Sequence, residues 1–283
     1  MRWSEGQRTM LREMGLRLWL PGPEAAAVEP VALAPVRPGA VVAPADPAPT
    51  PMVAKTTVAA RHPALVAVSV ASPQPAAPEA TLALDWPGLR AAVASCQACG
   101  LCASRRQTVF GVGHLQAHCM ILGGAPDEQE DAGGEPFVGE PGQLLDRMLR
   151  ALGLSREPTH PGAEVGGAAD PARQVFIANA LKCWPPRSRN PTPLELSSCR
   201  PFLERQVALV QPRVILAMGP LAVLTLLGST EPIGKLRGRL HRWHSVPVVV
   251  TYHPAYLLKH LADKAGAWED LCLAASCLDT VPG

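Results

Sequence analysis

Four short apolar runs separated by helical patterns constrain the fold of this chain more than any other feature of its sequence. Each run is short enough to be a buried strand, and the segments between them repeat apolar residues at helical spacing. Alternation of strands with helices predicts a parallel sheet covered on both faces. The sequence therefore predicts an α/β fold of three layers, α/β/α, with a central four-stranded parallel sheet. The expected strands are 119–122, 175–178, 214–217 and 246–250, and the expected helices cover 141–152, 193–210, 219–227 and 264–278.

Local signals mark the ends of these helices. Thr192-Pro193-Leu194-Glu195 reads as a capping box with Pro at the first helical position, which predicts a helix start. Gly153 follows an apolar stripe and predicts a helix end. Residues 155–174 are rich in Gly, Pro and Ala and predict a surface loop.

The N-terminal third of the chain has a different composition. Residues 21–80 hold 18 Ala and 13 Pro and no Phe, Trp or Tyr. Such a segment has little bulky surface to bury against the entropy lost on ordering it. We therefore expect a Pro/Ala-rich disordered linker over 21–83 and one folded domain over 84–283, which is long enough for a sizeable core.

Residues 1–20 form a separate short element. Met10, Leu11, Met14 and Leu18 recur near helical spacing, with Trp19 beside them. A helix of this length is marginal in water on its own. We expect an amphipathic peptide that forms on a partner surface, and the alternative is a helix packed on the chain's own domain.

Charge and cysteine content exclude several classes of protein. The net charge is +2, from 26 Lys and Arg against 24 Asp and Glu, so nucleic-acid binding would have to come from a local patch. No run approaches the roughly 18 apolar residues of a membrane helix. Early acidic residues argue against a secretory signal. We therefore expect a cytoplasmic protein with no membrane partner, in which eight cysteines favour thiolate–metal chemistry over disulfides.

Polar groups follow each expected strand. Parallel strands bring their carboxyl ends to one edge of the sheet, where ligands bind. We therefore expect the following groups to meet in one crevice: Gly123, Gly124, Ala125, Asp127, Glu128, Glu130 and Asp131 after the first strand, Asn179 and Lys182 after the second, Gly219 and Pro220 after the third, and His253 and Pro254 after the fourth.

The cysteines supply a second constellation. Cys96 and Cys99 form a C-x2-C pair, and Cys183 and Cys199 flank a Pro-rich loop and a helix start. Four thiolates suit either tetrahedral zinc or an iron–sulfur cubane, and the spacing does not choose between them. Cys102 adds a competing C-x2-C-x2-C set. We expect the other three cysteines to be ordinary buried thiols: Cys119, Cys272 and Cys277.

Several long motifs carry a resemblance to one family. Residues 96–113, GGAPDEQEDAGGEPFVGEPGQLLD at 123–146, IANALKCWPPRSRNP at 177–191 and TYHPAYLL at 251–258 resemble the bacterial family 4 uracil-DNA glycosylases, the iron–sulfur class. The resemblance spans about residues 90–278. It implies the α/β/α uracil-glycosylase fold and a structural [4Fe–4S] cluster, with Cys102 as a bystander. The ligands implied by position are Cys96, Cys99, Cys183 and Cys199.

The same resemblance implies roles for three side chains. Phe137 matches the residue that stacks on uracil, although it could also be a core residue after a turn. Asn179 matches the amide that reads uracil, because one amide can both donate to O4 and accept from N3–H. His253 matches the histidine that hydrogen-bonds O2 of the departing uracil anion.

The loop after the first expected strand matches the family less closely. In the best-known uracil glycosylases a carboxylate at the position of Ala125 holds the attacking water. The family 4 enzymes have Gly or Ala at this position instead, so Ala125 agrees with family 4. We therefore expect Glu130 to position the water or to exclude the 5-methyl group of thymine. Gly124 and Asp127 depart from the family's usual Glu and Gly, and Asp127 brings a charge close to the flipped nucleotide.

Contacts to DNA should use phosphate-seeking groups, because uracil occurs in any sequence context. Tyr256 and Leu257 could wedge into the gap left by a flipped base, or could equally be the first buried residues of a helix. The expected phosphate contacts are Lys182, Arg187 and Arg239, with Arg189, Arg237 and Lys259 as further candidates.

Together these features predict a monofunctional uracil-DNA glycosylase of base excision repair. It would hydrolyse the N-glycosidic bond of deoxyuridine and leave an abasic site, as a nucleoid-associated monomer. The alternatives are a sibling specificity, a form that traps its product, or an inactive damage-binding or zinc-stapled adaptor. The N-terminal peptide is similar to the segment of the clamp-loader psi subunit that docks on chi, so we expect residues 1–20 to recruit a replication protein.

Overall fold

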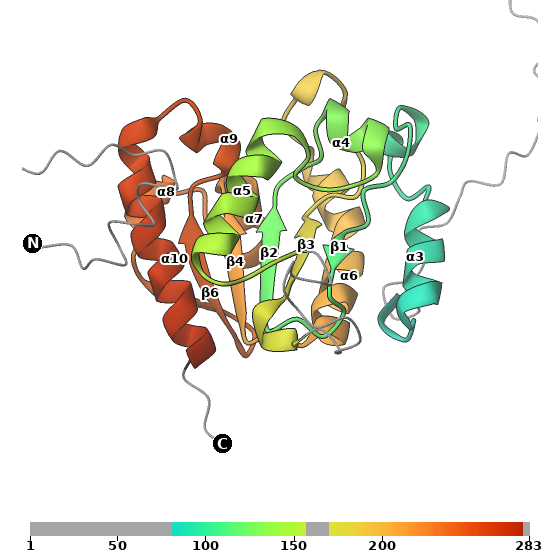
Figure 1. Ribbon diagram of the computed structural model, residues 1–283. Coiled ribbons are helices and arrows are strands. Elements are labelled where there is room, and N and C mark those ends of the chain that lie inside the picture. The colour runs from blue at the N-terminus through green and yellow to red at the C-terminus, as the bar shows by residue number, and fades with distance from the viewer. Residues whose placement is uncertain (1–80, 157–169, 280–283) are drawn as a thin grey trace, which may run out of the picture. The chain divides into compact units, whose positions relative to one another are not determined.

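A computed structural model of the protein describes residues 81–156 and 170–279, which form a mixed six-stranded sheet between helices (Figure 1). The predicted four-stranded parallel sheet is confirmed as its centre, in the order β3-β2-β4-β6. The prediction was incomplete, because a short antiparallel strand adds to each edge. The bounds are β1 Val112–Gly113, β2 Cys119–Gly123, β3 Val175–Asn179, β4 Val214–Met218, β5 Leu240–Trp243 and β6 Val246–Thr251.

Helices cover both faces of this sheet, as predicted. In Figure 1, α5 (Gly139–Ala151) and α10 (Lys264–Asp279) lie over the near face, and α6 (Pro193–Val210) lies behind it. Helix α7 (Pro220–Leu227) packs on the same face as α6, and α3 (Trp86–Ala94) packs against α6. The remaining helices are short: α4 Glu128–Gly133, α8 Ile233–Leu236, α9 Pro254–Leu257, and the 3-10 turns η1 Gly100–Ala103, η2 Pro171–Arg173, η3 Pro186–Ser188 and η4 Leu261–Asp263.

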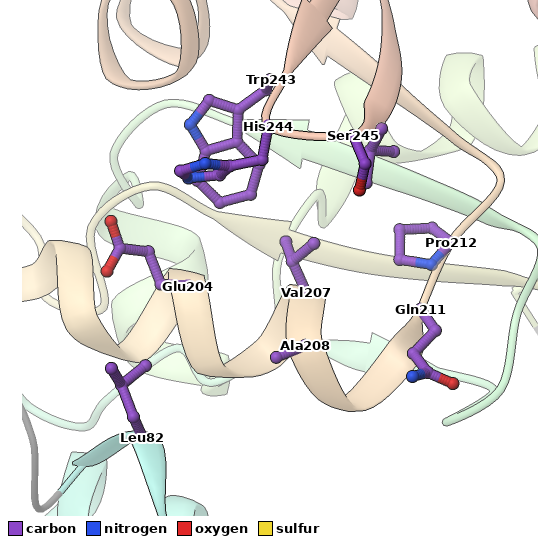
Figure 2. Close-up of a pocket in the computed structure, with 10 residues that line it drawn as sticks. Leu82, Glu204, Val207, Ala208, Gln211, Pro212, Trp243, His244 and Ser245 are labelled. Carbon is purple, nitrogen blue, oxygen red and sulfur yellow. The ribbon is translucent and has the colours of Figure 1, made fainter.

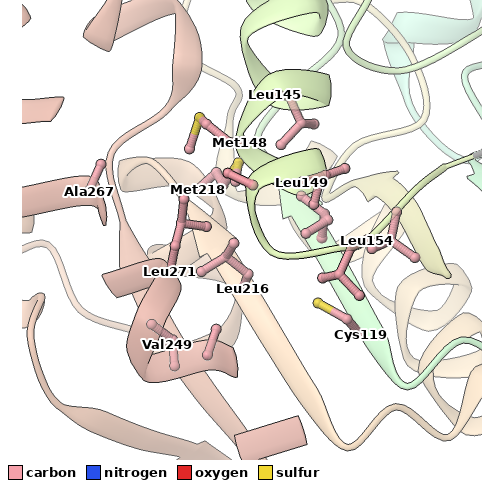
Figure 3. Packing of buried hydrophobic residues seen from close by; sticks show 14 of the residues in the cluster. Cys119, Leu145, Met148, Leu149, Leu154, Leu216, Met218, Val249, Ala267 and Leu271 are labelled. Atoms are coloured by element: carbon pink, nitrogen blue, oxygen red, sulfur yellow. The ribbon is translucent and has the colours of Figure 1, made fainter. Parts of the chain in front are cut away.

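The strands divide the core into two layers, because successive side chains point to opposite faces of a sheet. Ile121 of β2 belongs to one buried cluster with Leu145 of α5 and Leu271 of α10. Figure 3 shows Leu145 and Leu271 in this layer. Its neighbour Leu122 packs on the other face with Val207 of α6 and residues of α7. All four parallel strands are buried along their whole described length except the first two residues of β6.

The capping box predicted at 192–195 is present. The Thr192 hydroxyl accepts a hydrogen bond from Glu195 N, and the Glu195 carboxylate accepts one from Thr192 N. Pro193 occupies the first turn, where its missing N–H leaves no helical bond unmade. This cap fixes the start of α6, which carries Cys199.

The strand order places a topological switch point at the carboxyl ends of β2 and β4. The chain leaves β2 toward β3 on one side and later returns to β4 on the other side. Ligands of open α/β sheets bind at such a point. Helices α4 and α9 lie at this end of the sheet (Figure 1).

Some predictions fall outside the described residues. The peptide 1–20 and nearly all of the linker 21–83 lie there, as does most of the loop predicted at 155–174. Within the described part, no helix combines the length and the apolar character that crossing a membrane requires.

Candidate functional site

Asn179 is the last residue of β3, and it lies beside the end of β2. It pairs in register with Gly123 and is 2% exposed. A Cβ on Gly123 would lie 2.2 Å from Asn179 Oδ1 and 2.8 Å from the ring of Phe137. Gly123 therefore lets the amide and the phenyl ring approach the backbone at the carboxyl end of β2. Sequence analysis placed Gly123 in the crevice but did not foresee this steric requirement.

Phe137 and His253 bring two rings to the same place. Their centroids are 5.0 Å apart with an angle of 23° between the ring planes. His253 follows β6, and its Cβ would be 3.2 Å from a Cβ on Gly219, the residue after β4. Phe137 is 2% exposed and has a φ of 54°, a left-handed backbone that a bulky residue rarely adopts. The amide of Asn179 at the end of β3, the ring of His253 after β6 and the ring of Phe137 between α4 and α5 thus converge beside the end of β2.

Glu130 fixes the two groups that face it. Its Oε1 accepts a hydrogen bond of 2.6 Å from Phe137 N, and its Oε2 accepts one of 2.7 Å from Asn179 Nδ2. The first bond holds the strained turn, and the second fixes which way the Asn179 amide points. Because both carboxylate oxygens are engaged, this geometry favours a positioning role for Glu130 over the predicted contact with a water molecule.

Burial is the main cause that raises the pKa of Glu130 to about 7; the charge of Asp127 acts in the same direction, and the hydrogen bonds to Glu130 oppose both. A raised pKa means that the folded protein binds this proton more tightly than the unfolded chain. This tighter binding of the proton stabilises the folded protein fully below pH 4.5, the usual pKa of a Glu side chain. The stabilisation is lost as the pH rises through about 7. The shift corresponds to about 3 kcal/mol.

We therefore expect Glu130→Gln to make the free energy of unfolding less dependent on pH between about 4.5 and 7. Urea unfolding at several pH values measures this directly. Glu128→Gln is the matched control, because its side chain is 66% exposed on the same helix. An unchanged pH dependence in Glu130→Gln would contradict the assignment.

His253 is held as a neutral imidazole. Burial lowers its pKa to about 4, although the charge of Asp127 opposes this shift. Its Nδ1 accepts a hydrogen bond of 3.2 Å from Ala255 N, which leaves the ring proton on Nε2. His253 can therefore donate one hydrogen bond from Nε2 near neutral pH.

The loop between β2 and α4 supplies backbone as well as charge. Gly124 and Ala125 are partly exposed, and the Gly124 carbonyl accepts a hydrogen bond from Leu181 N. Asp127 caps α4 by accepting a bond of 2.8 Å from Glu130 N. The Asp127 carboxylate is exposed, and its charge acts on both Glu130 and His253. The cap gives Asp127 a structural role at the start of α4, separate from any effect of its charge on a ligand.

Two predicted DNA contacts are wrong. Lys182 is 1% exposed and donates hydrogen bonds to Asn179 O and Gln206 Oε1, so it cannot reach a phosphate on the surface. Leu257, the last residue of α9, is fully buried in the core, which confirms the alternative of a buried helix residue.

Other predicted DNA contacts are on the surface. Arg187 and Arg239 are exposed, and in residues 81–156 and 170–279 neither forms an ion pair. In contrast, Arg189 pairs with Glu195, and Arg237 pairs with Asp270 and Glu269. Tyr256 is 39% exposed.

The predicted metal ligands line one small pocket. No disulfide joins any of the eight cysteines, and five of them surround this pocket together with Arg105 and Lys182. Arg105 Nη1 lies 3.2 Å from Cys183 Sγ and donates to it. Among the described residues, no three His, Cys, Asp or Glu side chains converge as one metal ion requires. A cubane binds each thiolate through a different iron, so its ligands lie further apart, and the all-sulfur donor set fits it. The five cysteines are Cys96, Cys99, Cys102, Cys183 and Cys199.

The other cysteines lie in the core layer under α5 and α10. Cys119 is buried there, and burial raises the pKa of its thiol to about 12. Cys272 and Cys277 pack against the same layer. The prediction of ordinary buried thiols is thus confirmed for Cys119, whereas Cys272 and Cys277 are only half-buried.

A second pocket, of about 620 Å³, lies at the opposite end of the sheet. It is bounded by Glu204 and Val207 of α6 and by Trp243 and His244 at the β5–β6 turn (Figure 2). These elements meet at the amino ends of β4 and β6. None of the predicted site residues lines this pocket.

Comparisons with known proteins agree with the motifs. A family model described as "Uracil DNA glycosylase superfamily" matches residues 110–272. The type-4 uracil-DNA glycosylase of Saccharolobus solfataricus is 35% identical over 199 residues, which cover 67% of this chain and 85% of that protein. The type-4 enzymes of Thermotoga maritima and Archaeoglobus fulgidus are each 36% identical over 174 residues. Those matches cover 61% and 59% of this chain, and 82% and 79% of the relatives.

Proposed function

Because the chain belongs to the uracil-DNA glycosylase superfamily, we propose that it hydrolyses the N-glycosidic bond of deoxyuridine in DNA. The products are free uracil and an abasic site, which is the first step of base excision repair. The observation that carries this proposal is the convergence of the Asn179 amide, fixed by Glu130, with the rings of Phe137 and His253.

Asn179 reads the edge of a base that has been taken out of the helix. Glu130 occupies one hydrogen of its Nδ2, which leaves the second hydrogen and Oδ1 for a ligand. Oδ1 accepts from N3–H of uracil, and the remaining N–H donates to O4. Cytosine presents the opposite pattern at both positions, so it would leave these buried groups unpaired.

We assign the remaining contacts with the base to Phe137 and His253. The face of an aromatic ring stabilises an unstacked base by stacking. The neutral His253 donates from Nε2 to O2 of uracil, where negative charge develops as the glycosidic bond breaks. Water then attacks the sugar, and no covalent enzyme intermediate is needed.

We further propose a [4Fe–4S] cluster bound by Cys96, Cys99, Cys183 and Cys199. When bound, the cluster supplies a covalent clamp between distant segments and no redox step. The chain around Cys96 and Cys99 is thereby joined to the loop after β3 and to α6. Cys102 lines the same pocket, so this chain retains a fifth thiol beside the proposed set.

Tyr256 offers an aromatic surface at the DNA-facing edge of the site. Its ring stacks on Tyr252 at 5.1 Å and on His260 at 3.9 Å, and its hydroxyl donates to Asp263. This array is held in place before DNA arrives. We propose that the exposed part of Tyr256 enters the gap left by the flipped base and contacts the neighbouring bases, while Arg187 and Arg239 contact phosphates.

Replacing Tyr256 with Ala should raise KM for uracil-containing duplex about 5- to 100-fold, because stacking of one base contributes roughly 1–3 kcal/mol. The rate constant kcat should change much less. Tyr256→Phe is the control, because it keeps the ring and loses only the bond to Asp263. Equal KM values for Tyr256→Ala and the parent would contradict this role.

The finer biological setting is also a proposal. We place the enzyme in the bacterial cytoplasm, acting as a monomer on nucleoid DNA, with residues 1–20 contacting a replication protein. Equal recovery of replication proteins in a pull-down with and without residues 1–20 would contradict the last point.

The proposed reaction is tested on an oligonucleotide that carries one uracil. We expect free uracil to appear in solution while the strand stays intact until hot alkali cleaves the abasic site. Strand cleavage without alkali would exclude a monofunctional enzyme. Binding without release of uracil would favour a damage-binding adaptor instead.

A further inference from the structure

Lys182 is a buried cation between the uracil site and the cysteine pocket. Its side chain is 1% exposed, and Nζ donates to Asn179 O at 2.8 Å and to Gln206 Oε1 at 2.6 Å. Gln206 is itself fixed, because its Nε2 donates to Phe110 O at 2.8 Å. Both acceptors are neutral, so they orient the ammonium group without balancing its charge.

No carboxylate supplies that balance within the described residues, whose ion pairs do not include Lys182. A buried charge is strongly unfavourable unless an opposite charge lies close to it. The neighbouring groups able to carry negative charge are the thiols of Cys183 and Cys199, which line the same pocket as Lys182. A neutral set of thiols would leave the ammonium uncompensated.

We propose that Lys182 is the counter-charge of the iron–sulfur cluster, held in place by its hydrogen bonds to the main-chain carbonyl of Asn179 and to Gln206. Four thiolates bound to an iron–sulfur core leave a net negative charge, which is the partner that the buried ammonium lacks. This inference rests on the proposed cluster. Lys182 is therefore not a catalytic residue, because its hydrogen bonds go to the main chain of Asn179 and to Gln206.

The proposal separates the charge of Lys182 from its hydrogen bond. Lys182→Gln removes the charge but keeps an N–H donor for Asn179 O, whereas Lys182→Met removes both. If the charge stabilises the cluster, both variants should lose iron faster than the parent. If Lys182 served only to brace the loop after β3, Lys182→Gln would keep its iron.

The experiment compares full-length chains purified under the same conditions. Iron per chain is measured first, and then the rate at which the visible absorbance disappears in the presence of a chelator. We expect this rate to rise about tenfold in Lys182→Gln and Lys182→Met. Lys235→Met is the matched control, because Lys235 is exposed on α8, and it should lose iron at the parent rate.

The outcomes distinguish this inference from the proposed cofactor and activity. A parent protein without iron would overturn the cluster and the inference together, while uracil release would still test the activity. An iron-loaded parent with an unchanged rate in Lys182→Gln would overturn the inference alone. If Lys182→Met fails to fold, the rate of iron loss in Lys182→Gln compared with the parent still shows whether the charge of Lys182 stabilises the cluster.

Discussion

Replacing Asn179 with Ala should lower the single-turnover rate of uracil excision by about 10²- to 10³-fold. The substitution removes both of the hydrogen bonds that we propose Asn179 makes to the base edge. It also frees the Glu130 carboxylate, which holds the Asn179 amide at 2.7 Å in the parent. A buried carboxylate oxygen without its donor adds a further cost.

Strand scission after hot alkali, measured at saturating enzyme, reports this rate. Gln116→Ala is the matched amide control, because Gln116 is exposed at the turn between β1 and β2, at the other end of the sheet. The control should cleave at the parent rate. A loss of less than threefold in Asn179→Ala would contradict uracil reading by this amide.

The second large effect is expected for His253→Ala. Removing one donor to a developing anion costs about 10²- to 10³-fold in kcat. KM should change little, because the hydrogen bond to O2 strengthens mainly in the transition state. Steady-state kinetics with His114→Ala as control measures both constants, since His114 lies at the opposite end of the sheet.

The pH dependence of the uracil-excision rate distinguishes the role of His253 from that of Glu130. His253, with a pKa of about 4, stays neutral throughout the neutral range, whereas Glu130 titrates near 7. Any change in parent rate around pH 7 should therefore disappear in Glu130→Gln.

For His253→Ala, a large rise in KM with an unchanged kcat would show that His253 only binds the base.

Much of this architecture could be predicted because it is local in sequence. The apolar runs located all four parallel strands, each with its observed first residue and within one residue of its observed last residue. Because Asn179 and His253 sit at strand ends, parallel pairing alone brings them together. The two edge strands were not predicted because β1 has only two residues and β5 buries only Trp243 of its four residues, so neither forms an apolar run.

Non-local contacts account for what sequence analysis missed. Lys182 looked like a surface lysine because its partner Gln206 lies 24 residues further along the chain. Glu130 stood in an acidic run, and only the turn at Phe137 brings a backbone N–H to it. Leu257 was ambiguous until α9 was seen to pack on α5.

The most direct test of the central claim compares two single-stranded oligonucleotides that differ at one base, uracil or cytosine. Single strands remove the cost of unpairing, so the comparison reports the pocket itself. We predict alkali-dependent scission at uracil and none at cytosine, because Asn179 matches the hydrogen-bonding edge of uracil alone of these two bases. Equal scission at both bases, or at neither, would contradict the account.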